Sequence, residues 1–247
     1  VTEKIKYNAE NIIHVHIKSA VLKGAEYDVE PDQLIFSFHK TSTSLNVRKA
    51  PHMYGWDIMP RIVSGGIWRD VSISKVKDLR IVSARLVTLD VGCDSARIAV
   101  EAELENIDSN CDIVVCGVCG DSKFSDKLVI KENVASAEFS VANPRLWNPV
   151  NYGEPNLYEV TVYAILNGET VDSFSFKTGI RTVELVRTSI IDEDGKGDFH
   201  FKINGKKVFV LGTNWVPVDA FHSRDKERLP EILPMLNDIG CNALRCW

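Results

Sequence analysis

Two short stretches of the sequence combine aromatic, acidic and amide side chains outside any regular period. They are Tyr54–Arg61, which contains Trp56 and Asp57, and Gly212–Asp219, which contains Asn214 and Trp215. An indole face packs against the apolar C–H face of a sugar ring, while carboxylate and amide groups bind its hydroxyls. This composition favours a carbohydrate-binding site. The alternative is that both tryptophans are core residues.

The second stretch is more specific because of the elements expected around it. Residues 208–211 and 242–244 predict two successive parallel strands. In a (β/α)8 barrel, the residues at the carboxyl ends of the strands surround the active site. We therefore expect 212–215 and 245–247 to meet, which places four side chains around one mouth: Asn214, Trp215, Arg245 and Trp247.

A helix is expected between these two strands. Apolar residues recur with helical spacing from Leu229 to Ile239, Asp225 is a candidate N-cap, and Gly240 is placed to end the helix. The prolines at 230 and 234 predict a short or kinked helix. A single strand–helix–strand unit leaves strand edges unpaired. We therefore expect the chain to be the front part of a longer protein, with residues 188–247 as the truncated start of a (β/α)8 barrel.

The rest of the chain is predicted to be β-structure. Alternation of apolar and polar residues predicts strands at Asn11–Ser19 and Leu34–Phe38, within an all-β domain over residues 1–78. Six further strands at regular spacing predict an immunoglobulin-like β-sandwich over residues 79–187, a size of about 100 residues being typical. These strands are expected at 84–91, 97–104, 112–119, 137–141, 158–166 and 171–176. The fold class is thus mainly β, with two sandwiches before the barrel unit.

Composition and charge narrow the possible partners. The net charge is −5 and the Lys and Arg residues are scattered, which argues against a nucleic-acid partner. No apolar run approaches about 18 residues, so no membrane segment is expected. The six cysteines, at 93, 111, 116, 119, 241 and 246, are predicted to be core thiols. Cys116 and Cys119 have CxxC spacing without a second ligand pair, so we predict no metal. No cofactor is expected, and we expect a periplasmic, secreted or lysosome-like location.

Several ordered motifs carry a family resemblance. The stretch Val47–Val71, with its Gly-Trp-Asp, Pro-Arg and Gly-Ile-Trp-Arg motifs, resembles the sugar-binding jelly-roll of glycoside hydrolase family 2, and is nearest to its β-mannosidase branch. Leu146–Tyr158, Thr178–Arg181 and Phe201–Asp219 resemble the linking sandwich and the barrel entry of that family, in the expected order. The resemblance covers most of the chain from about Asn11 onward.

The resemblance implies a retaining exo-β-glycosidase that hydrolyses terminal β-linked sugars, with sandwich domains before the barrel. Its two catalytic glutamates, an acid/base and a nucleophile, lie about 5 to 5.5 Å apart in such enzymes. In the family both follow the Arg-Cys-Trp strand, so we expect them beyond Trp247 and predict that the isolated chain is inactive. Glu154 and Glu184 belong to sandwich or linker sequence and are not candidates.

By the same resemblance, six residues bind the terminal sugar. Trp56 and Asp57 reach from the jelly-roll into the barrel mouth, where the barrel residues Asn214, Trp215, Arg245 and Trp247 line the same subsite. Four other residues in these motifs are interpreted as structural: Arg61, Trp68, Arg69 and Trp147.

Two other functions stay open. The first is a non-catalytic carbohydrate-binding protein or adhesin built of two sandwiches. The second is a structural cell-surface sandwich without a sugar site, which leaves Gly212–Trp215 and Asn242–Trp247 unexplained.

Overall fold

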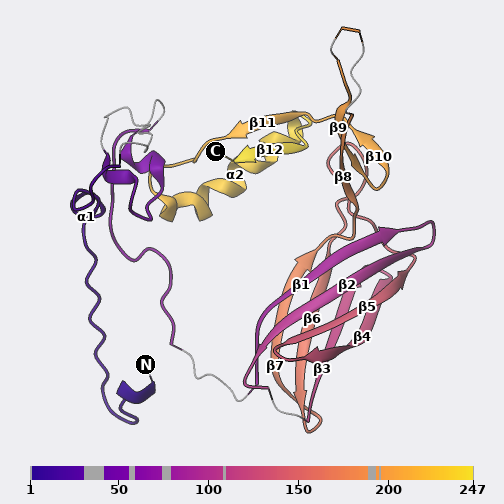
Figure 1. Cartoon of the computed structure of the whole chain (residues 1–247), viewed down its shortest axis with the longest axis horizontal. Coiled ribbons are helices and arrows are strands. Elements are labelled where there is room, and N and C mark those ends of the chain that lie inside the picture. The colour runs from indigo at the N-terminus through magenta and orange to yellow at the C-terminus, as the bar shows by residue number, and fades with distance from the viewer. Residues whose placement is uncertain are drawn as a thin grey trace. The chain divides into compact units, whose positions relative to one another are not determined.

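The computed structural model describes residues 2–30, 42–55, 59–73, 79–107, 110–188, 193–194 and 196–246 (Figure 1). The chain divides into two compact units. One combines Val1–Ser72 with Val216–Leu233 and Trp247, and the other combines Ile73–Trp215 with Pro234–Cys246. Within the described ranges, no helix has the length and apolar character needed to cross a membrane.

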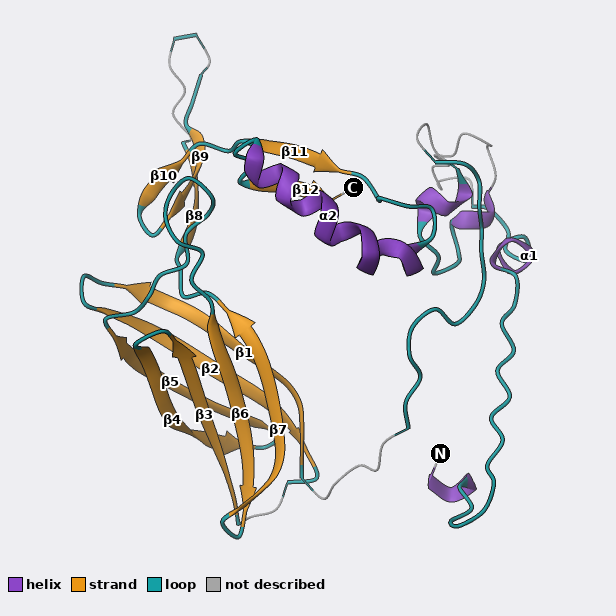
Figure 2. Ribbon diagram, turned by 180° about the vertical axis from the view of Figure 1, so that it is seen from behind, coloured by secondary structure: helices purple, strands orange, loops and turns teal. Residues whose placement is uncertain are grey.

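A seven-stranded antiparallel sheet forms most of the second unit, in the order β1-β2-β5-β4-β3-β6-β7. The sheet curls until its first and last strands approach each other (Figure 2). There the backbone N–H of Ile81 on β1 donates to the Asp172 carboxylate on β7, at 2.9 Å. The strands are β1 (Arg80–Val91), β2 (Ser95–Glu105), β3 (Cys111–Cys119), β4 (Ser122–Lys131), β5 (Val134–Ala142), β6 (Tyr158–Leu166) and β7 (Glu169–Thr178).

Alternating burial along these strands builds the core. On β2 every second residue from Ala96 to Leu104 is buried, and β6 repeats the pattern from Tyr158 to Ala164. Side chains alternate between the two faces of a strand, so the inward set forms one continuous apolar layer. The mainly β sandwich predicted from the sequence is therefore confirmed. The strand β4 is an addition that alternation did not indicate.

A small antiparallel sheet follows the sandwich, in the order β10-β9-β8. Its strands are β8 (Val183–Arg187), β9 (Phe199–Ile203) and β10 (Lys206–Val208). Asn204 and Gly205 form the hairpin turn at φ of 50° and 73°, values that suit Asn and Gly. The Asn204 amide also donates to the carbonyl of Trp147 at 3.0 Å and to Oδ1 of Asn148 at 3.1 Å, which fixes the hairpin to the sandwich.

The last elements form a strand–helix–strand unit: β11 (Gly212–Trp215), α2 (Asp225–Asp238) and β12 (Ala243–Cys246). The two strands are parallel, as predicted. The predicted first strand at 208–211 is wrong, because Val208 pairs with Phe201 in the hairpin and β11 begins only at Gly212. The helix predicted between the strands is present, but the alternative that it is short is wrong, and the alternative that it is kinked stays a prediction. The 14-residue α2 runs through both prolines, which lie on its exposed side, where water can bond the carbonyl that Pro234 leaves free.

The described N-terminal ranges, 2–30, 42–55 and 59–73, contain no strand longer than an isolated bridge. Their elements are η1 (Thr2–Lys4), α1 (Ala20–Gly24), η2 (Ser42–Ser44) and η3 (Pro51–Tyr54). The predicted strand at 11–19 is wrong: the segment is extended in Figure 1, but no described segment pairs with it and residues 11–18 are all exposed. Alternation indicates an extended backbone, whereas a strand also needs a partner. The predicted strand at 34–38 lies outside the described residues.

All six cysteines are free thiols. Cys111 and Cys241 are buried, as predicted for core thiols. Cys93 and Cys246 are exposed, so the prediction is wrong for them: Cys93 lies in the turn after β1 and Cys246 ends the open pair β11–β12. In the part of the chain that the structure describes, no group of three or more His, Cys, Asp or Glu side chains could hold a metal ion.

A buried hydroxyl pair in the sandwich core gives the first test. Tyr158 is fully buried. Its hydroxyl donates to Oγ of Ser122 at 2.7 Å and accepts from the N–H of Arg145 at 3.0 Å. Removing it in Tyr158→Phe leaves the buried Ser122 and the Arg145 N–H without this partner. We expect a loss of about 1–3 kcal/mol in the free energy of unfolding, measured by urea denaturation.

Tyr163→Phe is the matched control, because Tyr163 lies on the same strand and is only half-buried. It is expected to cost less than about 0.5 kcal/mol. Equal losses in the two variants would contradict the role assigned to the Tyr158 hydroxyl.

Candidate functional site

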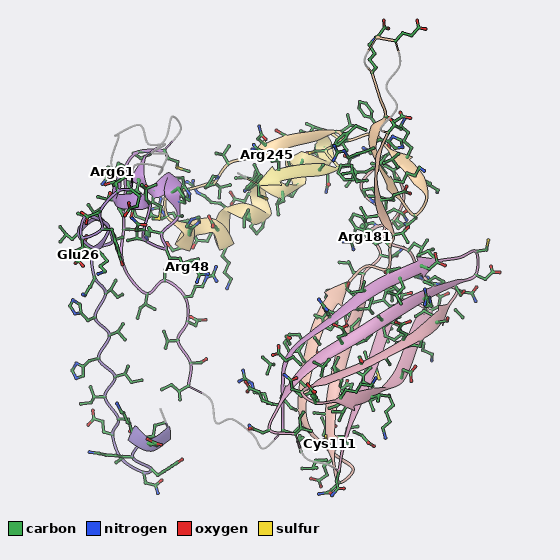
Figure 3. The ribbon with its side chains drawn as sticks, viewed as in Figure 1. Glu26, Arg48, Arg61, Cys111, Arg181 and Arg245 are labelled. Carbon is green, nitrogen blue, oxygen red and sulfur yellow. The ribbon has the colours of Figure 1, made fainter. Side chains whose placement is uncertain are left out.

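The strands β11 and β12 bring an amide and a guanidinium together. Asn214 and Arg245 are register partners in the parallel pair, so they project from the same face. An Nη1–H of Arg245, the residue labelled in Figure 3, donates to Oδ1 of Asn214 at 3.3 Å. Both side chains are exposed. Because a guanidinium carries several donors, this bond leaves others free for an oxygen-rich ligand.

Trp215 lies on the other face of the strand pair. Successive side chains alternate, so Trp215 shares its face with Thr213 and with its register partner Cys246. The predicted ring of four side chains is therefore reduced, among the described residues, to the pair Asn214 and Arg245. The half-buried Trp215 stands at the end of the strand.

The other predicted sugar-binding residues are Trp56, Asp57 and Trp247, which lie outside the described residues. The described members also sit differently from the prediction. Asn214 and Trp215 belong to β11 itself and Arg245 belongs to β12, rather than to loops that follow the strands.

Asn242 positions β11, a role that sequence reasoning missed. Its Oδ1 accepts from the N–H of Leu211 at 2.9 Å, and its Nδ2 donates to the carbonyl of Phe209 at 3.0 Å. Its backbone N–H donates to the carbonyl of Leu211 at 2.9 Å. One residue just before β12 thus holds the segment that enters β11. The only sequence signal was an amide at the start of a short apolar strand.

The end of α2 is fixed by a glycine and by a loop of the sandwich. Gly240 has φ of 68°, its N–H bonds to the carbonyl of Asn237 at 2.9 Å, and the N–H of Cys241 bonds to that of Leu236 at 2.8 Å. This is the Schellman pattern, and it agrees with the predicted helix stop. The side chain of Asn151 donates to the Gly240 carbonyl at 3.0 Å, which ties the entry to β12 to the sandwich.

Asp219 is a second residue that sequence reasoning did not select. It is 9% exposed, and its carboxylate accepts from the Phe221 N–H at 2.8 Å. The guanidinium groups of Arg224 and Arg228 lie 3.4 and 3.0 Å from it. The Phe221 N–H, with these two cations, holds the pKa of Asp219 below its ordinary range against the opposing effect of burial. Asp219 therefore ties the start of α2 to the segment before it.

The residues interpreted as structural make local contacts. The Arg61 guanidinium donates to the Tyr54 carbonyl at 3.2 Å and lies 5.4 Å from the centre of its ring. Arg69 covers the Trp68 ring at 4.3 Å. Arg181 lies 4.8 Å from the centre of the Trp147 ring. Each aromatic face is thus approached by a cation of the same chain.

The two glutamates set aside from the sequence also have local surroundings. Glu184 lies on β8, with its carboxylate 3.9 Å from the ammonium of Lys202 on β9. Glu154 accepts from the N–H of Asn148 through its backbone carbonyl at 3.0 Å.

Two family models match the chain. The model described as "Glycosyl hydrolase 2 galactose-binding domain-like" matches residues 1–69, and "Glycosyl hydrolases family 2" matches residues 79–181. Together they cover well over half of the sequence. The chain belongs to glycoside hydrolase family 2. The family resemblance stated from the sequence motifs is confirmed.

Relatives within the family include fungal β-mannosidases. The family 2 chain is 32% identical over 229 residues to beta-mannosidase B of Neosartorya fischeri and 31% identical over 227 residues to that of Aspergillus terreus. Each match covers 89% of this chain and 26% of the relative. The chain thus spans about a quarter of the length of the curated relatives it matches.

Solved structures of other glycoside-cleaving enzymes are similar in fold to this chain. The β-D-mannosidase of Dictyoglomus thermophilum matches 92% of this chain and 28% of that chain, with a TM-score of 0.77 and 28% identity. The exo-chitosanase of Amycolatopsis orientalis matches 68% of this chain and 20% of that chain, with a TM-score of 0.51 and 22% identity. The second likeness shows a shared fold only.

Asp219 gives a test that separates its charge from its hydrogen bond. Asp219→Ala removes the acceptor of the Phe221 N–H, so we expect exchange of that amide to become about tenfold faster. Asp219→Asn keeps an oxygen acceptor and is expected to retain most of the protection. Because the pKa of Asp219 is lowered, the wild-type protection is complete above about pH 4 and is lost as the pH falls through the folded pKa.

Asp238→Asn, at the exposed end of the same helix, is the control and should change nothing at Phe221. Equal exchange rates in Asp219→Ala and wild type would refute this role of the carboxylate.

Proposed function

We propose that this chain supplies the sugar-recognition part of a retaining exo-β-glycosidase that acts on terminal β-linked sugars and is β-mannosidase-like. The observation that carries the proposal is the likeness to the Dictyoglomus β-mannosidase over 92% of the chain. In this proposal the acid/base and nucleophile glutamates of the whole enzyme lie outside residues 1–247, and no carboxylate of this chain takes part in bond cleavage.

Three parts of the chain have distinct roles in the proposal. Residues 1–78 form the sugar-binding jelly-roll, residues 79–187 the immunoglobulin-like sandwich, and residues 188–247 the first strand–helix–strand unit of a (β/α)8 barrel. The family matches to 1–69 and 79–181 support the first two, and the parallel order of β11 and β12 supports the third. Parallel neighbours joined by a helix are the repeating unit of such barrels.

The sugar subsite is proposed to use Asn214 and Arg245 from the barrel strands. Their shared face and mutual hydrogen bond support this, because donors held by a strand pair can address neighbouring hydroxyls of one ring. Trp56, Asp57 and Trp247 complete the subsite in the proposal. Trp215, at the end of β11, lines its rim.

The test uses the full-length protein and a panel of aryl β-glycosides that carry mannose, glucose, galactose, glucosamine or glucuronate. We expect turnover of the β-mannoside above the others. Arg245→Ala is expected to lower kcat/KM by about 10²- to 10³-fold, since a charge-assisted hydrogen bond to the reacting sugar is lost. Arg97→Ala, an exposed arginine on β2, is the matched control and should leave kcat/KM unchanged.

The 247-residue chain is measured beside the full-length protein. Turnover by this chain alone would overturn the placement of the catalytic glutamates. Calorimetry with mannose and its oligosaccharides then distinguishes the glycosidase from a non-catalytic carbohydrate-binding protein. Tight binding by this chain, abolished in Trp56→Ala, would identify the carbohydrate-binding protein.

A further inference from the structure

Two histidines from distant parts of the sequence meet in the first compact unit. His52 lies on η3, and His222 begins η4 (His222–Arg224). Their ring centres are 5.0 Å apart, with the planes at 87°. The Trp68 ring stacks on His222, with centres 6.1 Å apart and planes at 29°. We call His52 and His222 the imidazole pair.

The Asp225 carboxylate interacts with both rings. Nδ1 of His222 lies 3.0 Å from Oδ2 of Asp225, the first residue of α2. Nε2 of His52 is buried and has no hydrogen-bond partner among the described residues. Among the described residues, the other charged groups at the pair are cationic: Lys49 acts on His52, and Arg69 covers the Trp68 ring. A single Asp225 charge can offset one imidazolium, and a second has no counterpart in the described surroundings.

His222 borders a cavity that admits water. The cavity has a volume of about 290 Å³, and its walls include Lys49, Met53, Gly65, Trp68, Phe221 and His222. Protons can therefore reach the His222 ring without unfolding of the unit, whereas Nε2 of His52 is covered.

The backbone carbonyls of His52 and Met53 each accept one hydrogen bond from a later residue. The carbonyl of His52 accepts from the N–H of Gly55 at 3.1 Å, and the carbonyl of Met53 accepts from the N–H of Ile62 at 3.0 Å. Any movement of the His52 ring out of its contact is thus transmitted to hydrogen bonds on both sides of residues 55–62.

We propose that the imidazole pair is a pH-sensitive contact, which opens the hydrogen bonds of Pro51–Gly55 when both rings are protonated. Two imidazolium rings at this separation repel each other in partly buried surroundings. The opening does not depend on the proposed function. An effect on sugar binding does rest on it, since Trp56 and Asp57 follow Gly55 directly.

The sign of the pH dependence follows from the His52 environment. Burial lowers the pKa of His52, the charge of His222 lowers it further, and Lys49 acts in the same direction, whereas Asp225 raises it. The unfolded chain therefore binds this proton more readily than the folded one. The stabilising contact is complete above the ordinary histidine pKa of about 6.5 and is lost as the pH falls from there through the folded pKa.

The experiment follows the histidine ring signals of the 247-residue chain by NMR between about pH 8 and pH 5. In His222→Gln, the pKa of His52 is expected to rise toward its ordinary value, because the neighbouring charge is gone. The Trp68 indole signal of the wild type should change as the pH passes through the His52 midpoint. His16→Gln, an exposed histidine away from the pair, is the matched control and should leave His52 unchanged.

A second measurement needs no variant. In the wild type, the exchange rates of the Gly55 and Ile62 amides, corrected for the intrinsic effect of pH, are expected to rise about three- to tenfold on acidification through the His52 midpoint. An unchanged His52 titration in His222→Gln, or exchange rates that ignore the midpoint, would overturn the proposal. Neither readout uses a sugar, so loss of this proposal and loss of the proposed function are separate results.

Discussion

The loop between β5 and β6 carries the hydrogen bonds on which the position of the candidate pair Asn214 and Arg245 depends. Its Trp147 carbonyl and Asn148 side chain hold Asn204 of the hairpin, at 3.0 and 3.1 Å. Farther along, the Tyr152 hydroxyl accepts from the N–H of Phe209 at 2.7 Å, just before β11. The Asn151 amide holds the carbonyl of Gly240, just before β12. One loop thus fixes the approach to both strands.

This loop is itself held by packing that allows little substitution. A Cβ on Gly179 would lie 2.5 Å from Cβ of Trp147, closer than van der Waals contact permits. The N–H of Trp147 bonds to the carbonyl of the buried Ile180 at 3.0 Å. The Arg181 guanidinium lies over the same ring, 4.8 Å from its centre. Residues 179–181 therefore pack against Trp147 and hold it in place, which explains its structural role.

The parts of the fold that the sequence predicts are those in which local pattern and burial coincide. β2 and β6 alternate strictly because one face of each is fully buried. The strand β4 was not predicted because the first of its buried residues is polar: Ser122, whose hydroxyl accepts a hydrogen bond from the Tyr158 hydroxyl. The strand predicted at 11–19 has the right alternation, but its pairing depends on a distant partner that no local pattern reports. Alternation of apolar and polar residues therefore predicts an extended backbone better than it predicts which strands pair.

The sequence also predicts one part of the candidate site and misses another. The sequence predicts that Asn214 and Arg245 come together, since parallel order and strand spacing suffice for that. The sequence misplaces the start of β11, because Val208 belongs to the preceding hairpin. Residues 209–211 form no strand ladder and are held by side chains of Asn242 and Tyr152. Side-chain hydrogen bonds of this kind leave no periodic trace in a sequence.

The chemical character of the pair follows from its partner atoms. Among the described residues, Arg245 bonds to the neutral amide of Asn214 and to no carboxylate, so Asn214 orients its charge without offsetting it. The bond orients the guanidinium while its other N–H groups stay exposed to solvent. A carboxylate at position 214 would instead form an ion pair and compete with a ligand for the same donors. An amide that positions without neutralising suits the recognition of hydroxyl oxygens, which carry partial charge only.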